Sequence, residues 1–205
     1  MARAVLYDYF RSSAAYRARI ALNLKGIDYE QRQVSLVEGA QKDPAYRALN
    51  PFGQIPTLDD DGVVVTESGA ILLYLARKSG KLMPRDLAGE AQVLRWSFAA
   101  LTTIELPVLS LWFVNLSGGK DSKPSEALLG WAEMRLKQLD GWLANRHFIA
   151  TEEFTVADIL MTHVLVPHRY SLEPYPNLVA YRARCYERPA WKKAHDAYCE
   201  RVEAA

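Results

Sequence analysis

The feature that most constrains the fold of this chain is the point at which its strand signals stop. Roughly the first 80 residues alternate short runs of β-branched and aromatic residues with segments of helical periodicity. From about Ala88 onward, only long segments of helical periodicity follow. An α/β unit followed by an all-helical unit predicts two domains. We expect an N-terminal domain over residues 1–82 and a helical domain over residues 88–205, with a short link near Lys81 to Leu87.

The expected element order of the N-terminal domain is β-α-β-α-β-β-α. Its first strand, "AVLYDY", runs into Ser12 and Ser13, polar residues suited to starting a helix, and Gly26 supplies a natural helix stop. The dipeptide Asp61-Gly62 is the best hairpin signal in the sequence. The expected elements are a strand over 4–9, a helix over Ala14–Leu24, a strand over Tyr29–Leu36, a short helix within 42–51, two strands within 55–68 and a helix over Ser68–Arg77.

Gly, Pro and Asn residues separate the helical segments of the second domain. Thr155 to Asp158 has the pattern of a capping box, with Phe154 available as a hydrophobic staple. We interpret this motif as structural and expect loss of Asp158 to harm folding more than chemistry. The expected helices cover Glu90–Asn115, Ser125–Leu143, Thr155–Pro167, Asn177–Glu187 and Ala190–Val202.

Charge and cysteine content narrow the class of function. With 25 Lys and Arg against 24 Asp and Glu, the formal net charge is +1. The sequence has no long block of basic residues, so we do not expect nucleic-acid binding. The two cysteines, Cys185 and Cys199, fit neither a disulfide framework nor a zinc site, so we expect a reducing cytoplasm. No apolar run approaches the roughly 18 residues of a membrane span, and we expect a soluble protein without a signal peptide. No histidine has metal-site spacing, and we interpret all four as structural or surface residues: His147, His163, His168 and His195.

Ser12 and Ser13 lie where the first strand gives way to the first helix. Helix capping is the more common role of such serines. The alternative is that a hydroxyl at the helix N-terminus donates a hydrogen bond to an anion, with help from the helix dipole. If that anion is a thiolate, lowering its pKa by two units needs roughly 2.7 kcal/mol of differential stabilisation. One charge-assisted hydrogen bond together with the dipole could supply that amount.

Two further segments could bind a peptide-like ligand. A cis bond at Ile55-Pro56 would leave the backbone of Ile55 free to pair with an extended peptide, and a plain strand start is the alternative. Glu67 and Ser68 open a helix, where a serine usually caps its own backbone. The N–H groups and hydroxyl there could instead hold a ligand carboxylate while Glu67 pairs with an ammonium group. Amine and carboxylate recognition side by side indicates an amino-acid-like ligand end.

Four motifs together make the sequence resemble the cytosolic glutathione transferases, above all the zeta class that includes maleylacetoacetate isomerase. They are "YFRSSAAYRARIALNLKGIDYE", "NPFGQIPTL", "ESGAILLYLA" and "FTVADIL", and the likeness spans nearly the whole chain. The resemblance implies a thioredoxin-like N-terminal domain (βαβαββα), a C-terminal helical bundle, a homodimer and glutathione as the cofactor. By position, Ser12 matches the family's thiol-activating serine, with Ser13 beside it as helper or alternate. The other matches are Gln54 and the backbone of Ile55 for the middle of glutathione, Pro56 as the cis-proline, and Glu67 with Ser68 for the γ-glutamyl end.

Ala14 is where the sequence departs from this pattern. Zeta enzymes commonly have Ser-Ser-Cys at this point, and this chain has Ser-Ser-Ala. The missing cysteine weakens the isomerase interpretation without excluding it. With no cysteine before Cys185, chemistry of the dehydroascorbate-reductase or omega type, in which a protein cysteine forms mixed disulfides, is not expected.

The second substrate is expected to bind between the domains. The apolar excess of "TIELPVLSLWF" suits a pocket wall, although core packing is an equal alternative for each of its residues. Arg169 falls near the place where zeta isomerases keep an arginine for a substrate carboxylate, and Arg11 is a second candidate; a solvated surface role is the alternative for both. The expected pocket residues are Phe10, Arg11, Thr103, Leu106, Trp112 and Arg169.

Three functions remain open from the sequence. We favour a glutathione transferase in which Ser12 stabilises the thiolate that adds to a small electrophile. A glutathione-dependent cis-trans isomerase acting on maleylacetoacetate or maleylpyruvate is second, and it requires a cationic pocket for two carboxylates. A non-catalytic interaction module is third, and it would not need Ser12, Gln54 and the Glu67-Ser68 pair together.

Overall fold

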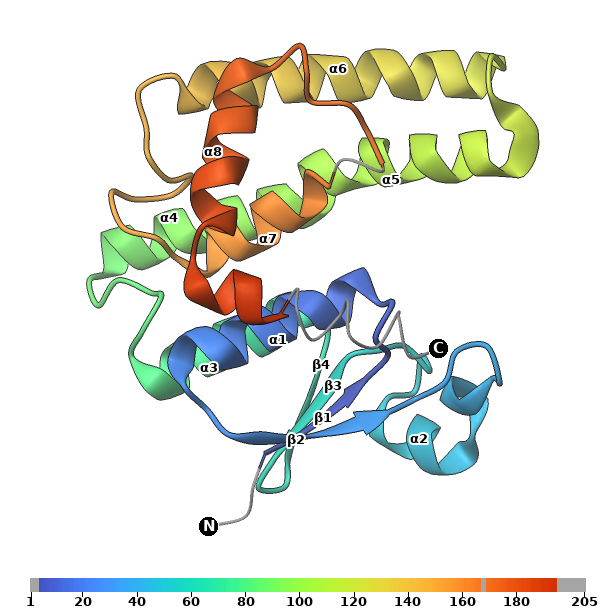
Figure 1. The fold of residues 1–205 in the computed structure, drawn as a ribbon, viewed down its shortest axis with the longest axis vertical. Coiled ribbons are helices and arrows are strands. Elements are labelled where there is room, and N and C mark those ends of the chain that lie inside the picture. The colour runs from blue at the N-terminus through green and yellow to red at the C-terminus, as the bar shows by residue number, and fades with distance from the viewer. Residues whose placement is uncertain (1–3, 167–168, 195–205) are drawn as a thin grey trace. The chain divides into compact units, whose positions relative to one another are not determined.

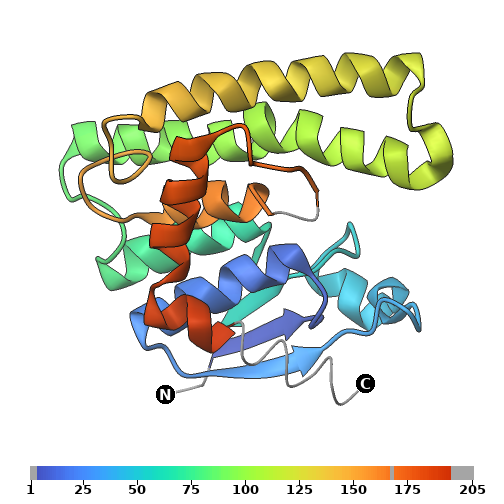
Figure 2. The same cartoon turned by 45° about the horizontal axis from the view of Figure 1, so that its top comes forward.

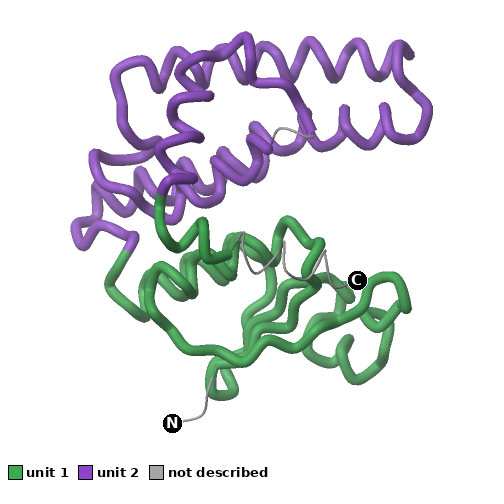
Figure 3. Tube along the Cα trace, in the orientation of Figure 1, with its two compact units in different colours: residues 1–81, 188–205 green, residues 82–187 purple. Residues whose placement is uncertain are grey.

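The computed structural model describes residues 4–166 and 169–194 (Figure 1). These residues form two compact units, coloured separately in Figure 3. The first comprises Met1–Lys81 with Arg188–Ala205, and the second comprises Leu82–Glu187, as far as these ranges are described. His168, His195, Cys199 and most of the expected helix Ala190–Val202 lie outside the described residues, whereas residues 189–194 are helical.

The first unit is built on a four-stranded sheet with the strand order β2-β1-β3-β4. β1 pairs with β2 in parallel and with β3 antiparallel, and β3 pairs antiparallel with β4. Alternate residues of β1 are buried, and Leu6 lies opposite Leu58 of β3 in the centre of the core. The strands cover Ala4–Asp8 (β1), Tyr29–Gln33 (β2), Thr57–Asp60 (β3) and Val63–Thr66 (β4).

Two helices of the first unit pack against each other and lie on the same face of the sheet (Figures 1 and 2). Helix α1, Ser13–Lys25, ends at Gly26 in the left-handed conformation, with φ at 65°. Helix α3, Ser68–Ser79, buries Ile71, Leu72 and Leu75. A short 3₁₀ turn over Ala40–Lys42 (η1) precedes helix α2 over Pro44–Leu49.

The expected thioredoxin-like order β-α-β-α-β-β-α is confirmed, with one strand shorter than expected. The second strand was expected to reach Leu36 but ends at Gln33. The chain then turns, because the N–H of Ala40 bonds to the carbonyl of Ser35 and Gly39 adopts a φ of 77°. The β-branched and apolar residues of this segment therefore lie in a turn, which periodicity alone did not separate from a strand.

The second unit is helical. A continuous helical run begins with α4 and passes through a π-helical segment, η2, into α5 and a second π-helical segment, η3. Helix α7 is the core of the unit, since all of its residues are buried. The elements are α4 (Leu87–Phe98), η2 (Ala99–Ile104), α5 (Glu105–Val114), η3 (Asn115–Gly119), α6 (Lys123–Leu143), α7 (Val156–Val164) and α8 (Pro176–Tyr186).

The helical run Leu87–Gly119 corrects one expectation from the sequence. Its 33 residues are long and apolar enough to cross a membrane by length and composition, whereas no such segment was expected. The segment passes this test because Glu105 is the single charged side chain between Phe98 and Leu116. It was missed because Thr and Ser residues interrupt the run of apolar residues. One such helix is weak evidence for a membrane span, because core helices of globular proteins pass the same test.

Asp158 confirms the expected capping box and also anchors the second unit. Its fully buried carboxylate accepts hydrogen bonds from the N–H and the hydroxyl of Thr155, at 2.8 and 3.1 Å. It also accepts from the N–H of Ile149 at 2.8 Å and from the hydroxyl of Tyr181 on α8 at 2.9 Å. One side chain therefore joins the start of α7 to the preceding loop and to α8.

Candidate functional site

The register of the sheet brings the predicted ligand-binding segments of the first unit to one end of the sheet. Tyr7 of β1 lies opposite Thr57 of β3, and Thr57 lies opposite Thr66 of β4. The loop that carries the serines follows β1, the Ile55-Pro56 segment precedes β3, and Glu67 follows β4. Because the three paired residues form one row across the sheet, the three segments leave the sheet side by side.

Ser12 is the N-cap of α1. Its backbone is extended, and its Oγ accepts a hydrogen bond from the N–H of Ala15 at 3.2 Å. The capping interpretation is thus confirmed. A hydroxyl oxygen that accepts in this way still carries a proton that it can donate, so capping and anion binding are compatible. Ser13 is the first residue of α1, and both serines are half-buried.

A buried arginine holds the turn that precedes Ser12. The turn is closed by a hydrogen bond from the N–H of Ser12 to the carbonyl of Tyr9 at 2.8 Å. Arg19 of α1 donates to the carbonyl of Phe10 at 3.3 Å and forms a buried ion pair with Asp8 at 3.0 Å. The turn is therefore fixed to the same helix that Ser12 caps. The sequence analysis missed Arg19.

Phe10 and Arg11 form the outer part of the same turn. The Phe10 ring is half-buried and lies 5.0 Å from the Tyr9 ring, measured between centroids. The exposed Arg11 places its guanidinium 5.3 Å from the centre of the Phe10 ring, a cation–π contact. Both residues lie next to Ser12 in the chain, and their assignment to a substrate pocket stays a prediction.

The bond between Ile55 and Pro56 is cis, as expected from the motif. The side chain of Gln54 is exposed, while its carbonyl accepts two hydrogen bonds from the α2 region. Tyr46 donates to this carbonyl through its hydroxyl at 2.6 Å, and Asn50 donates through Nδ2 at 2.8 Å.

Tyr46 and Asn50 were missed by the sequence analysis, and both are buried. The Tyr46 hydroxyl also lies 3.0 Å from Oγ1 of Thr57. Burial raises the pKa of Tyr46, so its hydroxyl stays protonated at neutral pH. The only local signal for Asn50 is its place directly before a proline, and Tyr46 carries no local signal at all.

Glu67 and Ser68 begin α3 in an unusual conformation. Glu67 is the N-cap and has a φ of 63°, a region that costs a residue with a side chain roughly 1–3 kcal/mol and that clusters at ligand-binding sites. Its own side chain is exposed. Ser68 is buried, and its Oγ accepts a hydrogen bond at 3.3 Å from Arg17 of α1, which is also buried. Arg17 adds a positive charge beside the N-terminus of α3, and it too was missed.

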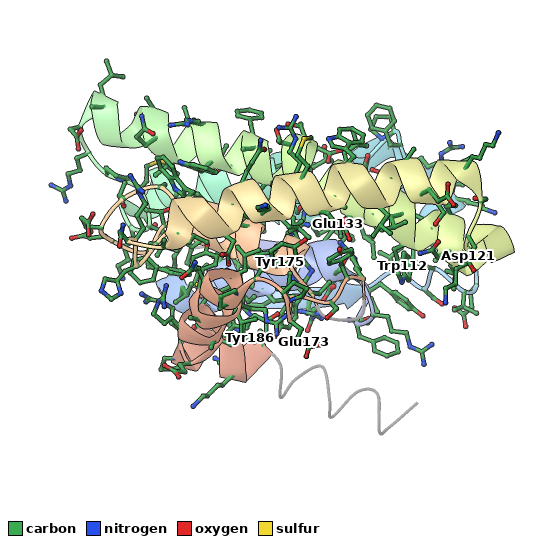
Figure 4. The ribbon with its side chains drawn as sticks, turned by 90° about the horizontal axis from the view of Figure 1, so that it is seen from above. Trp112, Asp121, Glu133, Glu173, Tyr175 and Tyr186 are labelled. Carbon is green, nitrogen blue, oxygen red and sulfur yellow. The ribbon has the colours of Figure 1, made fainter. Side chains whose placement is uncertain are left out.

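The predicted pocket residues of the second unit lie on the long helical run. Thr103 belongs to the π-helical segment η2, and Leu106 and Trp112 belong to α5. Leu106 is 51% exposed, and the half-buried Trp112 makes an edge-on contact with Phe113, with 4.9 Å between ring centroids. In the view of Figure 4, Trp112 lies toward the end of the hairpin between α5 and α6.

Arg169 is engaged by an acidic partner in the same unit. Its guanidinium forms an ion pair with Glu105 at 3.1 Å, and both side chains are largely buried. The next residue, Tyr170, places its hydroxyl 3.5 Å from Glu133 of α6, one of the residues labelled in Figure 4, and burial raises the pKa of Tyr170. The charge that was expected to meet a substrate carboxylate is therefore matched by Glu105.

The arrangement in the first unit provides recognition groups for a short peptide with an amino-acid-like end. Glu67 offers a carboxylate for an ammonium group, while Ser68 and Arg17 offer donors for a carboxylate. The Ile55-Pro56 segment leads into a strand, and Ser12 offers a hydroxyl at a helix N-terminus. Among the residues that the structure describes, no group of His, Cys, Asp and Glu could hold a metal ion.

Comparison with known proteins gives matches along both units. Residues 3–77 match the family model of the glutathione S-transferase N-terminal domain, and residues 101–189 match that of the C-terminal domain. The chain is 34% identical over 195 residues to glutathione S-transferase Z1 of Arabidopsis thaliana, covering 89% of this chain and 85% of the relative. It is 35% identical over 207 residues to maleylacetoacetate isomerase of Rhizobium meliloti (strain 1021), covering 93% and 95%.

Solved structures give the same result. A glutathione transferase from Pseudomonas putida, crystallised with glutathione disulfide, matches with a TM-score of 0.84 and 27% identity over 94% of this chain and 90% of that chain. A glutathione transferase family member from Pseudomonas fluorescens pf-5, crystallised with two glutathione molecules, matches with a TM-score of 0.86 and 27% identity over 94% and 92%.

Proposed function

This chain belongs to the glutathione S-transferase family, and from that premise we propose that it binds glutathione at the end of the sheet and transfers its thiolate to a small electrophile. The observation that carries the proposal is the row formed by Tyr7, Thr57 and Thr66. This row places the serine loop, the Ile55-Pro56 segment and the Glu67-Ser68 pair next to one another.

The groups at this end of the sheet fit the parts of glutathione. Glu67 would pair with its ammonium group, and Ser68 with Arg17 would receive the γ-glutamyl carboxylate. Gln54 and the backbone of Ile55 would hold the middle of the tripeptide by strand-like pairing, with Pro56 setting the direction of the chain. The γ-glutamyl end and the middle of the ligand thus each have a partner of matching chemistry.

Ser12 would act on the sulfur. Its Oγ accepts from Ala15, so its own proton would be available to the sulfur, and the N-terminus of α1 contributes its dipole. Hydrogen bonding to the charged form of a thiol lowers its pKa, and a thiolate is the reactive species. When bound, glutathione supplies the nucleophilic sulfur. Ser13 would serve as helper or alternate, and Phe10 and Arg11, next to Ser12 in the chain, would contact the electrophile. The assignment of Thr103, Leu106 and Trp112 to the electrophile pocket stays a prediction from the sequence.

A glutathione-dependent isomerase is the second candidate, favoured by the similarity to the Rhizobium enzyme. That reaction would need cationic groups for the carboxylates of its substrate. Arg169 is bound to Glu105, so it would have to exchange this partner for a substrate carboxylate, and the exposed Arg11 would be the second cation. The transferase assignment requires neither step, which is why we prefer it.

We also propose that the protein is a cytoplasmic homodimer. Large apolar side chains are exposed in both units, including Phe52 at 76%, Leu87 at 83% and Phe98 at 60%. A contiguous apolar patch is typical of a surface that another chain covers, and a homodimer interface could bury these side chains. The partner would be a second copy, and light scattering on the purified protein would measure the mass.

The test is a calorimetric titration of the purified protein with glutathione, followed in the same sample by turnover of a chloronitrobenzene and of maleylacetoacetate. We expect binding at or below millimolar concentration and conjugation of the chloronitrobenzene. Isomerisation of maleylacetoacetate without conjugation would favour the second candidate. No binding at millimolar glutathione would contradict both and would leave a non-catalytic interaction module.

A further inference from the structure

We propose that Tyr46 is a positioning residue for glutathione binding, acting through its hydroxyl on the carbonyl of Gln54 and on the side chain of Thr57, the residues on either side of the Ile55-Pro56 segment. This inference rests on the proposed function and names a group that it does not include. The hydroxyl donates to the carbonyl of Gln54 at 2.6 Å and lies 3.0 Å from Oγ1 of Thr57. It therefore bridges the residue before this segment and the residue after it.

Burial and a ring contact hold the Tyr46 side chain in place. Its side chain is buried, and its ring lies 5.8 Å from the ring of Tyr7 in β1, measured between centroids. Tyr7 is the strand partner of Thr57, so the bridge and the sheet fix the same residue from two directions. Thr57 is fully buried, and water is therefore a poor replacement for the tyrosine hydroxyl there.

Asn50 also donates a hydrogen bond to the Gln54 carbonyl but does not reach Thr57. Its Nδ2 donates to that carbonyl at 2.8 Å, while its Oδ1 accepts from the N–H of Phe52 at 3.2 Å. Both contacts of Asn50 lie before Ile55. Only Tyr46, among the side chains whose contacts are described here, connects Gln54 with Thr57. Loss of its hydroxyl would leave Gln54 held by Asn50 and Thr57 held by the sheet, with this connection between the two sides removed.

The consequence concerns binding and not the chemical step. The backbone of Ile55 is the proposed pairing edge for the tripeptide, and Ser12 lies on a separate loop held by Arg19. A looser pairing edge would bind glutathione less tightly, since ordering the segment would then oppose binding. The pKa of the bound thiol, which depends on Ser12, would stay unchanged.

The variant Tyr46→Phe removes the hydroxyl and keeps the ring, and Tyr74→Phe is a matched control. Tyr74 lies on α3 in the same unit, and its hydroxyl donates to Oδ2 of Asp60 at 2.8 Å, away from the proposed site. For Tyr46→Phe we expect the Kd and the KM for glutathione to rise by about three- to tenfold, a change of the size that one net hydrogen bond contributes. We expect kcat and the thiol pKa, read from thiolate absorbance, to match the wild type.

Tyr74→Phe also removes a tyrosine hydroxyl from the first unit. It should leave the Kd for glutathione unchanged. A Kd for Tyr46→Phe within twofold of the wild type would overturn the inference, as would equal weakening in both tyrosine variants. Should Tyr46→Phe fail to fold, Thr57→Val removes the other end of the bridge without a change of shape and is expected to weaken binding in the same direction. Absence of glutathione binding by the wild type would refute the proposed function itself, which keeps the two failures distinct.

Discussion

The substitution Asp158→Asn tests whether the second unit depends on one buried carboxylate. Oδ1 of Asp158 accepts from the N–H of Ile149 and the hydroxyl of Tyr181, and Oδ2 accepts from the N–H and the hydroxyl of Thr155. An asparagine has one oxygen in place of two. Whichever way its amide turns, the NH₂ group faces a backbone N–H, either that of Ile149 or that of Thr155. A hydroxyl can reverse its role, but a backbone N–H cannot.

The magnitude follows from that count. At least one buried backbone N–H loses its acceptor, at a cost of about 1–3 kcal/mol. For a chain of this size, each kcal/mol lowers the melting temperature by about 2–4 °C, so we expect a fall of about 2–12 °C. Asp158→Ala leaves the N–H groups of both Ile149 and Thr155 without that acceptor and should cost more than Asp158→Asn. Either loss is a large share of a typical folding free energy of about 5–15 kcal/mol.

The assay is thermal and urea unfolding followed by circular dichroism, with Glu152→Gln as a control. Glu152 is an exposed acid in the loop before α7, so its neutralisation should leave stability unchanged. Glutathione affinity and kcat of the folded Asp158→Asn protein at 20 °C should equal those of the wild type. An unchanged melting temperature would refute the argument, and so would a loss of glutathione affinity without a loss of stability.

Two further predictions concern the first unit. Ser12→Ala should lower kcat/KM with a chloronitrobenzene by about tenfold to a thousandfold while the protein stays folded. Ser12→Asp keeps an N-cap acceptor for Ala15 but offers no proton, and it should lose activity equally. Full activity of a Ser12→Ala, Ser13→Ala double variant would exclude the thiolate role. Burial and the charge of Lys81 lower the pKa of Lys25 to about 8 from 10.5, so the unfolded chain binds more protons between these values and the free energy of unfolding rises with pH there. In urea unfolding at pH 7 to 10, the wild type should gain stability relative to Lys25→Met only above about pH 8. Lys42→Met, at an exposed lysine, is the control. A constant difference in the free energy of unfolding between wild type and Lys25→Met over this range would contradict the lowered pKa of Lys25.

The parts of the site that could be predicted from the sequence are those with a local signature. Ser12 precedes a helical segment, Pro56 opens a strand, and Glu67 with Ser68 joins a strand to a helix, so short-range rules single out each of them. The fold class followed from the same kind of pattern, since the change from mixed to helical periodicity predicted an α/β part followed by a helical part. These residues lie where one strand or helix gives way to the next, and few residue types suit such positions.

The residues that the sequence analysis missed act over long distances along the chain. Arg17 bonds to Ser68, which is 51 positions away, and no spacing rule connects the two. Tyr46 in α2 reaches Thr57 across a loop whose path depends on Gly53, where an added Cβ would lie 2.7 Å from the carbonyl oxygen of Gln41. One signal was available, because Arg17 and Lys25 share a face of α1 with the apolar Ala21, a pattern that indicates a buried charge.

The buried cations of α1 connect this helix to two of the three segments of the proposed site, the serine loop and the start of α3. Arg19 holds the turn before Ser12, Arg17 reaches Ser68 at the start of α3, and Lys25 donates to the carbonyls of Leu75 and Lys81 at the end of α3. Burying a charge is costly unless it is well bonded, and apolar residues of similar size would often stabilise the fold equally well. An apolar helix would pack against the sheet but would not form the hydrogen bonds that hold the serine loop and the start of α3. The charges of α1 therefore hold the serine loop and the start of α3 in the positions that the proposed glutathione site requires.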